Sequence, residues 1–288
     1  MTSTQAAENT GRSVKATLHA ALDTSSSGER KVARALLASY PAAGLGTVAE
    51  LAKRAGVSPP TVVRFIARLG YQGFPNFQRA LVKEVDESMG SPLEQYSQHE
   101  RPVGEGLLSH AHSTFSEMLN NTFADLPESE FRSAVDLICD PRRTIRVIGG
   151  RFSRLLADYL VAHMQLLRPA VSVVGQDEIS RLSAIADIKP STLFVVYDFR
   201  RYDDASIEFA SAAAERGASL VLVTDNWLSP IAKFATAVLP CRVESPSPFD
   251  SLVPAMAVTE SIVAAVTEEL GAPGRKRLEV IESVFHSK

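Results

Sequence analysis

Three closely spaced stretches near the start of the chain place apolar residues at helical spacing. They cover residues 26–40, 47–56 and 58–69. In the last stretch the apolar positions fall at i, i+3, i+4 and i+7, which is one face of a helix. These positions hold Val62, Phe65, Ile66 and Leu69. Because each helix has an apolar face to cover, the pattern predicts a small all-α domain.

The second and third stretches carry residues that begin and end helices. Thr47 and Glu50 have the spacing of a capping box, and Gly56 is expected to end that helix. Ser58 is the predicted N-cap of the next helix, and Pro59 takes its first position, where the missing N–H is no loss. Two helices joined by a short turn with glycine are typical of a helix-turn-helix motif, whose second helix enters the major groove of DNA.

The outward face of the third helix predicts which residues contact DNA. Arg64 has the fork geometry for guanine O6 and N7, whereas Thr61 can contact a thymine methyl or a phosphate. Arg68, one turn further along, is expected to meet a phosphate. The predicted DNA-contacting residues are Thr47, Lys53, Ser58, Pro60, Thr61, Arg64, Arg68 and Arg79. The alternative interpretation is a helical bundle with a charged surface.

From residue 144 onward the pattern changes to short, continuous apolar runs. These runs cover residues 145–148, 171–174, 193–197, 220–223 and 237–239, with helical patterns at 153–167 and 203–216. Short buried strands that alternate with helices predict a doubly wound parallel sheet. The predicted fold class is therefore α/β, with an all-α helix-turn-helix domain followed by a doubly wound sheet. Ligands of such sheets bind at the carboxyl ends of the strands.

The 288 residues suffice for two domains, and an interruption of the helical hydrophobic pattern suggests where the domains divide. Glycine and proline interrupt the pattern between residues 89 and 104. We predict a helix-turn-helix domain at 1–85, a linker and connecting helix at 86–125, and the sheet domain at 126–288.

Charge is distributed unevenly along the chain, whose formal net charge is −3. Residues 1–90 carry 11 Lys/Arg and 7 Asp/Glu, whereas residues 91–288 carry 19 and 26. Between Arg30 and Lys83 the only acidic residue is Glu50. Phosphate attraction is the main sequence-independent contribution to DNA affinity, so this segment supports double-stranded DNA as a partner. A solvated charged surface would give the same counts, so the choice between the two interpretations depends on the helix-turn-helix motif.

The composition excludes several classes of protein. With 45% hydrophobic and 22% charged residues, the chain is of the globular kind. No apolar run approaches the roughly 18 residues of a membrane span, and the polar start lacks the order of a signal peptide. We therefore expect a cytoplasmic protein without a membrane partner. Cys139 and Cys241 lack metal-ligand spacing, so we expect two reduced thiols and neither metal nor cofactor.

The helix-turn-helix stretch resembles a family of bacterial regulators. Its third helix reads Ser-Pro-Pro-Thr-Val-Val-Arg-Phe from Ser58, and Leu-Gly-Tyr-Gln-Gly-Phe-Pro-Asn-Phe follows from Leu69. This combination is similar to the signature of the RpiR/MurR family, in which the DNA-binding module is joined to a sugar isomerase (SIS) domain. The resemblance implies that the second domain has the SIS fold, binds a phosphosugar and switches DNA binding.

The second domain follows the SIS order of elements with two departures. Gly149 and Ser153 match the family's Gly-x-Gly-x-Ser loop, but Arg151 replaces its second glycine. After the third strand, the family has a Ser-x-Ser-Gly-x-Thr loop that holds phosphate with hydroxyls and backbone N–H groups. The residues at its Ser, Ser, Gly and Thr positions are Asp198, Arg200, Arg201 and Asp203. The hydroxyl cradle is therefore absent.

Two interpretations of this replacement are open. In the functional one, Arg151, Arg200 and Arg201 converge on an anionic ligand, such as a phosphorylated or carboxylated sugar. In the structural one, the same arginines pair with neighbouring aspartates and fill a site that no longer binds phosphosugar. Those aspartates are Asp198, Asp203 and Asp204.

Further side chains are expected at the same edge of the sheet. Ser153 can cap the following helix or bond a ligand, and capping is favoured. Asn226 and Ser229 are candidates for lining the pocket. Trp227 either forms a wall of that pocket or packs at the protein surface. The predicted ligand-binding residues are Gly149, Gly150, Arg151, Ser153, Asp198, Arg200, Arg201 and Asp203.

These features lead to three hypotheses on function. The first is a DNA-binding transcription regulator, a homodimer or tetramer on a palindromic operator, controlled by a small anionic, sugar-derived metabolite. The second is a SIS-fold sugar-phosphate isomerase fused to a DNA-binding module. Its candidate bases, Glu178, Glu260 and His286, fall in no motif, so we expect no catalytic residues and no enzyme activity. The third is a DNA-binding dimer whose second domain senses nothing.

Overall fold

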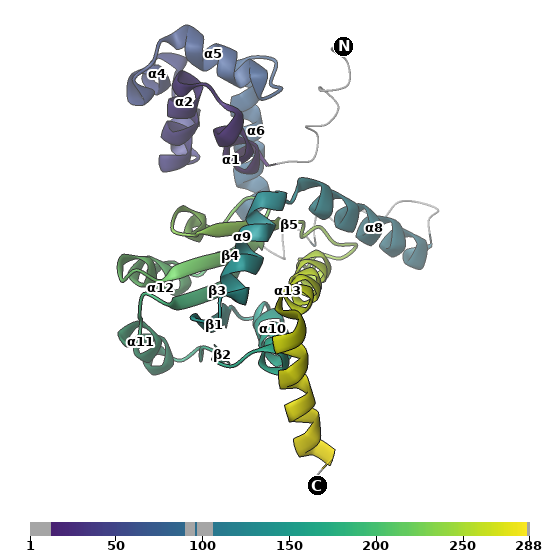
Figure 1. The fold of residues 1–288 in the computed structure, drawn as a ribbon. Helices are drawn as coiled ribbons and strands as arrows, with labels where there is room; N and C mark the ends of the chain where they lie inside the picture. Colours follow the sequence, from purple (N-terminus) through teal and green to yellow (C-terminus); the bar gives the residue numbers. More distant parts are fainter. Residues whose placement is uncertain (1–12, 90–95, 97–105, 287–288) are drawn as a thin grey trace. The chain divides into compact units, whose positions relative to one another are not determined.

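The computed structural model describes residues 13–89, 96 and 106–286 (Figure 1). The chain divides into two compact units, residues 1–98 and 99–288. Each unit has a hydrophobic core of its own. The predicted fold class is confirmed, because the described part of the first unit is helical and the second unit is built on a parallel sheet. The predicted linker, residues 86–125, lies partly outside the described residues, and its limits stay a prediction.

The described part of the first unit is a bundle of short helices. They are α1 (Val14–Thr24), α2 (Ser27–Ala38), α3 (Ala42–Leu45), α4 (Val48–Ala55), α5 (Pro59–Arg68) and α6 (Phe74–Met89). The four apolar positions predicted for α5 are all buried in the core of this unit. Helix α1 has no counterpart among the predicted helices. It starts at Ser13, whose side chain accepts a hydrogen bond from the Ala16 N–H at 3.0 Å.

The ends of α4 follow the sequence prediction. The Thr47 hydroxyl accepts a hydrogen bond from the Glu50 N–H at 3.2 Å, and the Glu50 carboxylate accepts one from the Thr47 N–H at 2.7 Å. Gly56 ends the helix at φ 62° and ψ 42°, a left-handed conformation that glycine adopts without strain. Ser58 takes the N-cap position of α5, but its hydroxyl bonds the Thr61 hydroxyl at 2.9 Å instead of a backbone N–H.

The second unit alternates helices with five parallel strands. Helices α8 (Leu107–Asp125) and α9 (Glu128–Cys139) precede β1 (Thr144–Gly149), α10 (Arg154–Leu167), β2 (Val171–Val173), α11 (Glu178–Ala186), β3 (Thr192–Asp198) and α12 (Asp204–Glu215). The chain continues through β4 (Ser219–Asp225), the 3₁₀ turn η1 (Pro230–Lys233), β5 (Ala237–Cys241) and α13 (Val253–His286). The five strands lie within a few residues of their predicted ranges, whereas α11 and α13 were not predicted.

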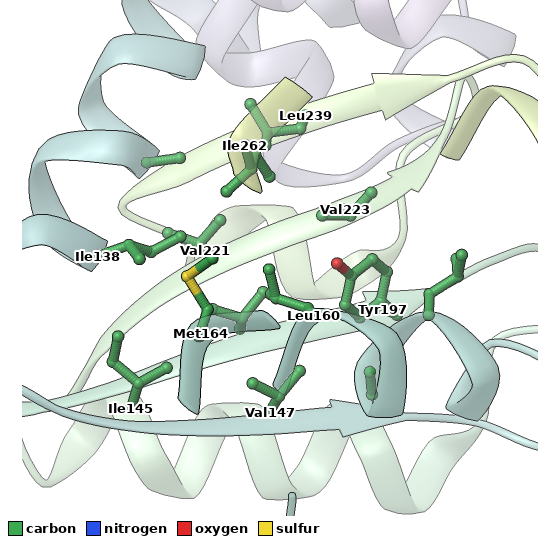
Figure 2. Packing of buried hydrophobic residues seen from close by; sticks show 14 of the residues in the cluster. Ile138, Ile145, Val147, Leu160, Met164, Tyr197, Val221, Val223, Leu239 and Ile262 are labelled. Carbon is green, nitrogen blue, oxygen red and sulfur yellow. The ribbon is translucent and has the colours of Figure 1, made fainter. Parts of the chain in front are cut away.

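Both faces of the sheet are covered by helices, as a parallel sheet requires. Alternate residues of a strand point to opposite faces, so Val195 lies in one core and Phe194 in the other. Figure 2 shows the first of these cores, where Met164 and Leu160 of α10 meet the strands. Figure 1 shows α11 and α12 on the opposite side of the sheet from α10 and α13. The sheet is therefore the middle of three layers.

The strand order is β2-β1-β3-β4-β5, which places a change of direction between β1 and β3. The chain runs from β1 outward to β2 and then crosses to β3 on the other side. Ligands of open α/β sheets bind beyond the carboxyl ends of the strands at such a point. The register sets Gly149 beside Tyr197 and Asp198 beside Thr224. The loops that follow β1, β3 and β4 therefore lie at one edge, which we call the carboxyl edge.

Candidate functional sites

The outward face of α5 is the candidate nucleic-acid interface of the first unit. Its buried stripe occupies one side of the helix, and Pro60 and Arg64 are exposed on the other, with Thr61 half-buried. Lys53, at the end of α4, and Arg79, on α6, are exposed as well. An exposed arginine on the second helix of a helix-turn-helix motif has the reach to contact a base edge.

Arg68 has surroundings that the sequence pattern did not predict. Its guanidinium donates to the Thr24 carbonyl at 3.1 Å and to the Ser25 hydroxyl. It also forms an ion pair with Glu29 at 3.3 Å. Arg68 therefore joins the end of α5 to the turn between α1 and α2, and its predicted phosphate contact stays a prediction.

The loop after β1 is closed by a serine in the second unit. A Cβ atom on Gly149 would lie 2.5 Å from the Ser153 carbonyl oxygen, so only glycine fits there. The Ser153 hydroxyl accepts a hydrogen bond from the Gly150 N–H at 2.8 Å and donates one to the Tyr197 carbonyl at 2.9 Å. The favoured capping role of Ser153 was wrong, because its side chain makes no capping bond to α10. It ties the β1 loop to the end of β3 instead.

Asp198 ends β3 as a buried carboxyl group, with 6% of its surface exposed. It accepts a hydrogen bond from the Ser229 hydroxyl, just before η1. Loss of hydration is the main cause that raises the pKa of Asp198 to about 7. The carboxylates of Asp225 and Asp203 act in the same direction, whereas the Ser229 hydrogen bond opposes them. Asp198 therefore gains a proton near neutral pH.

The other acids of the carboxyl edge hold backbone and side chains in place. Asp225, fully buried at the end of β4, accepts hydrogen bonds from the Tyr202 hydroxyl at 2.7 Å and the Trp227 N–H at 2.9 Å. Asp203 caps α12 by accepting from the Ser206 N–H at 3.1 Å and pairs with Arg181 at 3.5 Å. These bonds fix the loops that follow β3 and β4.

Two of the three loop arginines face the same carboxylate. Arg200 forms a two-point ion pair with Asp250, in the loop between β5 and α13, and Arg201 lies 3.8 Å from the same carboxylate. The Arg151 guanidinium is exposed and lies over the Phe152 ring, 5.2 Å from its centroid. Arg200 and Arg201 thus face Asp250, an aspartate that the structural interpretation did not name.

Asp250, Asp225 and Tyr202 belong to this edge, although the sequence patterns did not single them out. The signal that could have found Asp225 is its place two residues after the apolar run 220–223, where a parallel strand reaches the carboxyl edge. Asp250 lies several residues beyond β5 in a stretch rich in serine and proline, so its partner could not be deduced from spacing.

The candidate bases for isomerase chemistry lie on helices. Glu178 is exposed in the first turn of α11, and Glu260 of α13 is exposed and accepts a hydrogen bond from the Tyr159 hydroxyl at 3.0 Å. The side chain of His286 lies outside the described residues. Within residues 13–89 and 106–286 no His, Cys, Asp and Glu side chains gather as metal ligands do. In that same part of the chain, every helix is too short or too polar to cross a membrane.

Two family descriptions match separate parts of the chain. The description "Helix-turn-helix domain, rpiR family" matches residues 13–88, and "SIS domain" matches residues 137–265. Together they take in more than half of the sequence. The chain belongs to the RpiR family. In this RpiR-family protein α4 and α5 form the helix-turn-helix motif, and the parallel sheet is the core of the SIS domain.

Two relatives extend the match over nearly the full length. The HTH-type transcriptional regulator HexR of Pseudomonas aeruginosa is 27% identical over 266 residues, which is 91% of this chain and 91% of that protein. HexR of Escherichia coli K12 is 26% identical over 273 residues, 92% of this chain and 91% of that protein. The RpiR-family chain is a DNA-binding transcription regulator.

Solved structures share the fold. The sugar isomerase domain of an RpiR transcription factor from Sphaerobacter thermophilus superposes with a TM-score of 0.58 at 23% identity, covering 62% of this chain and 99% of that one. NanR of Vibrio vulnificus, solved in complex with ManNAc-6P, superposes with a TM-score of 0.54 at 18% identity, covering 94% and 97%. At these identities the likeness establishes the SIS fold of the second unit.

Proposed function

We propose that this regulator reads its operator with α5 and that a small anionic, sugar-derived effector in the SIS unit controls operator binding. One observation carries the proposal. The same chain joins a helix that exposes Arg64 to a sheet whose carboxyl edge carries Arg200 and Arg201. Arginine forks suit phosphate and carboxylate groups alike. An effector shifts operator binding only by its different affinity for two arrangements of the protein.

The class of effector is supported by a structural neighbour. The NanR structure contains ManNAc-6P, and NanR aligns with this chain over most of both lengths. By analogy we place a phosphorylated or carboxylated sugar at the carboxyl edge. The predicted ligand-binding residues of the loops after β1 and β3 stay candidates for direct contact, and Ser153 is assigned a positioning role because both its hydrogen bonds are within the loop framework.

On the DNA side we assign different roles to the predicted residues. Arg64 and Thr61 face the bases, while Lys53 and Arg79 meet phosphates. Thr47 sets the start of α4 through its capping box and is a positioning residue. Pro60 and Ser58 shape the exposed beginning of α5. We propose a homodimer or tetramer in the cytoplasm, because paired recognition helices match the two-fold symmetry of an operator.

Asp198 is the one feature that favours the isomerase alternative. Such chemistry needs a base whose pKa lies near neutral pH beside the substrate, and the pKa of Asp198 is raised to about 7. Its carboxyl is buried and bonded by Ser229, however, which favours a structural role. We therefore propose that the protein is not an enzyme. Turnover of an aldose phosphate or amino-sugar phosphate that is lost in Asp198→Asn would establish the opposite.

The proposed function is tested by operator binding with and without metabolites. DNA upstream of the protein's own gene and of its neighbours is titrated with the full chain, and fluorescence anisotropy reports the Kd. One sugar phosphate or sugar acid in a panel should change that Kd by about 5–150-fold and raise the melting temperature of the protein as its concentration increases. If the DNA binds but no metabolite changes either quantity, the non-sensing dimer is the correct description.

A further inference from the structure

The ion pair of Arg200 and Asp250 joins two loops that are distant in sequence. Arg200 follows β3, and Asp250 lies between β5 and α13. The Arg200 Nε donates to Oδ2 of Asp250 at 2.8 Å, and its Nη2 donates to Oδ1. The two side chains are only 9% and 15% exposed. A planar, two-point contact of this kind is how guanidinium groups hold phosphate and carboxylate ligands.

Two more groups complete the surroundings of this carboxylate. The Arg201 Nη2 lies 3.8 Å from Oδ2 of Asp250. The ring of Trp227 lies against the Arg200 guanidinium, 5.2 Å from centroid to Cζ, which favours one orientation of the fork. Arg201 has a φ of 63°, a backbone region that non-glycine residues rarely adopt and that often marks a functional loop. Two arginines therefore face one carboxylate at the edge where ligands of this fold class bind.

We propose that Arg200 and Arg201 form the anion-binding site of the SIS unit and that Asp250 fills this site until an oxyanion of the effector displaces it. The proposal rests on the proposed function, which places an anionic effector in this unit. The ligand group is a phosphate or a carboxylate, since both match the fork. Asp250 thus acts as a competitor within the protein. The apparent affinity for the effector is the intrinsic affinity multiplied by the fraction of molecules in which Asp250 has left the site.

Displacement of Asp250 also gives the effector a way to alter the protein. Asp250 immediately precedes Ser251, whose N–H donates to the Val243 carbonyl at 2.8 Å and whose hydroxyl accepts from the Val253 N–H at 3.1 Å. The ion pair therefore connects the loop after β3 with the beginning of α13. An effector that takes the place of Asp250 removes that connection.

The test uses the full chain, inorganic phosphate and the fluorescence of Trp227, the only tryptophan in the sequence. Because Trp227 packs on Arg200, a new occupant of the fork changes its emission. In wild type the change should require high phosphate. In Asp250→Asn, which leaves the arginines without their competitor, the phosphate Kd should fall by about tenfold or more. Adding Arg200→Lys to that variant should abolish the response, because lysine lacks the two-point fork.

A matched control separates this site from any arginine that has lost its partner. Arg242, whose side chain is 8% exposed, pairs with both Asp125 and Glu244. The double change Asp125→Asn and Glu244→Gln therefore creates a comparable buried arginine elsewhere.

Isothermal titration calorimetry measures the phosphate Kd of this control and of Asp250→Asn, because Trp227 emission reports on Arg200 and not on Arg242. A phosphate Kd of the control as low as that of Asp250→Asn would overturn the proposal, as would an unchanged phosphate Kd in folded Asp250→Asn. If that variant does not fold, as judged by far-UV circular dichroism, Asp250→Ser carries the same expectation. Sodium chloride at matched ionic strength corrects for screening.

Acetate in place of phosphate distinguishes the two oxyanions. A lower Kd for phosphate assigns the site to a phosphate group, and a lower Kd for acetate assigns it to a carboxylate. Operator binding is measured separately. If phosphate binds as expected but no metabolite affects operator binding, the proposed function fails while the anion site stands. If metabolites act and phosphate does not bind Asp250→Asn, only the inference on Asp250 fails.

Discussion

Arg64 and Arg68 lie one turn apart on α5 but have different surroundings. Arg64 is exposed, whereas the Arg68 guanidinium bonds Thr24 and Ser25 and pairs with Glu29. A free fork can satisfy its donors at a base edge, but one already bonded to the protein must first give up those contacts. The two arginines should therefore differ in their effect on DNA recognition.

Arg64→Ala should reduce discrimination between operator and random DNA by about 1–3 kcal/mol, because a two-point contact to guanine is lost. Lys53→Ala should weaken binding to both DNAs by similar factors, because a phosphate contact carries no sequence information. Titrations of the two DNAs at one salt concentration check this. Retention of full discrimination by Arg64→Ala would show that another residue reads the operator.

Asp198 is the residue whose protonation should affect stability. Its pKa is about 7 in the folded protein and near 4 in an unfolded chain. Between about pH 4 and 7 the folded state holds a proton that the unfolded state has lost, so this group makes the free energy of unfolding fall as pH rises. Above pH 7 both states are ionised and the loss is complete.

Asp198→Asn should remove that dependence. The variant should therefore gain stability relative to wild type as the pH is raised from 5 to 8, because its amide accepts the Ser229 hydrogen bond without a charge. Urea unfolding followed by Trp227 emission reports on the second unit. Parallel pH profiles of the two proteins would place the pKa of Asp198 near its ordinary value.

Helix α5 depends on contacts at both its ends. Pro59 starts it, and the apolar stripe buries its inner side. At its last turn Arg68 provides the connection to the turn between α1 and α2. The orientation of the recognition helix is thus set partly by a helix that precedes the motif in sequence.

Arg68→Ala should loosen this connection and destabilise the first unit by about 1–2 kcal/mol, the range for lost hydrogen bonds to a partly exposed charged group. Hydrogen exchange should speed up in α1 and in the last turn of α5. Arg64→Ala is the matched control and should leave exchange unchanged. If instead Arg68→Ala weakens DNA binding at unchanged exchange, Arg68 contacts a phosphate.

Under the proposed function, the protein combines a DNA-reading helix with an effector-binding domain, and a symmetric oligomer matches the symmetry of the operator. A two-fold oligomer presents two copies of α5, so its operator should contain inverted half-sites separated by one or more helical turns. A five-base-pair insertion between the half-sites turns one of them to the opposite side of the duplex. Binding should fall toward that of a single half-site, and a full-turn insertion should restore part of it. Equal affinity for all three DNAs would indicate a monomeric reader.

Local sequence patterns were enough to predict the helix-turn-helix motif of the first unit and the strands of the second. The Thr47–Glu50 capping box, the Gly56 helix end and the apolar stripe on α5 each depend on residues within one or two helical turns, so the helix-turn-helix motif could be predicted. Short continuous apolar runs rich in β-branched residues, with helical patterns between them, favour a buried parallel sheet. Helices α1, α6, α11 and α13 were missed, since their apolar positions become distinctive only when the surfaces that cover them are known.

The roles of the charged residues were decided by the tertiary structure alone. Arg200 and Asp250 are 50 positions apart, and Arg68 and Thr24 are 44 apart. Which charged residues meet across such separations depends on how the strands align and on the paths of the loops. Spacing along the chain gives no information on either. Likewise, Asp198 has a raised pKa because burial removes its water and places Asp225 beside it. The type of each side chain limits the interactions it can form, and the tertiary structure determines which other residue it meets.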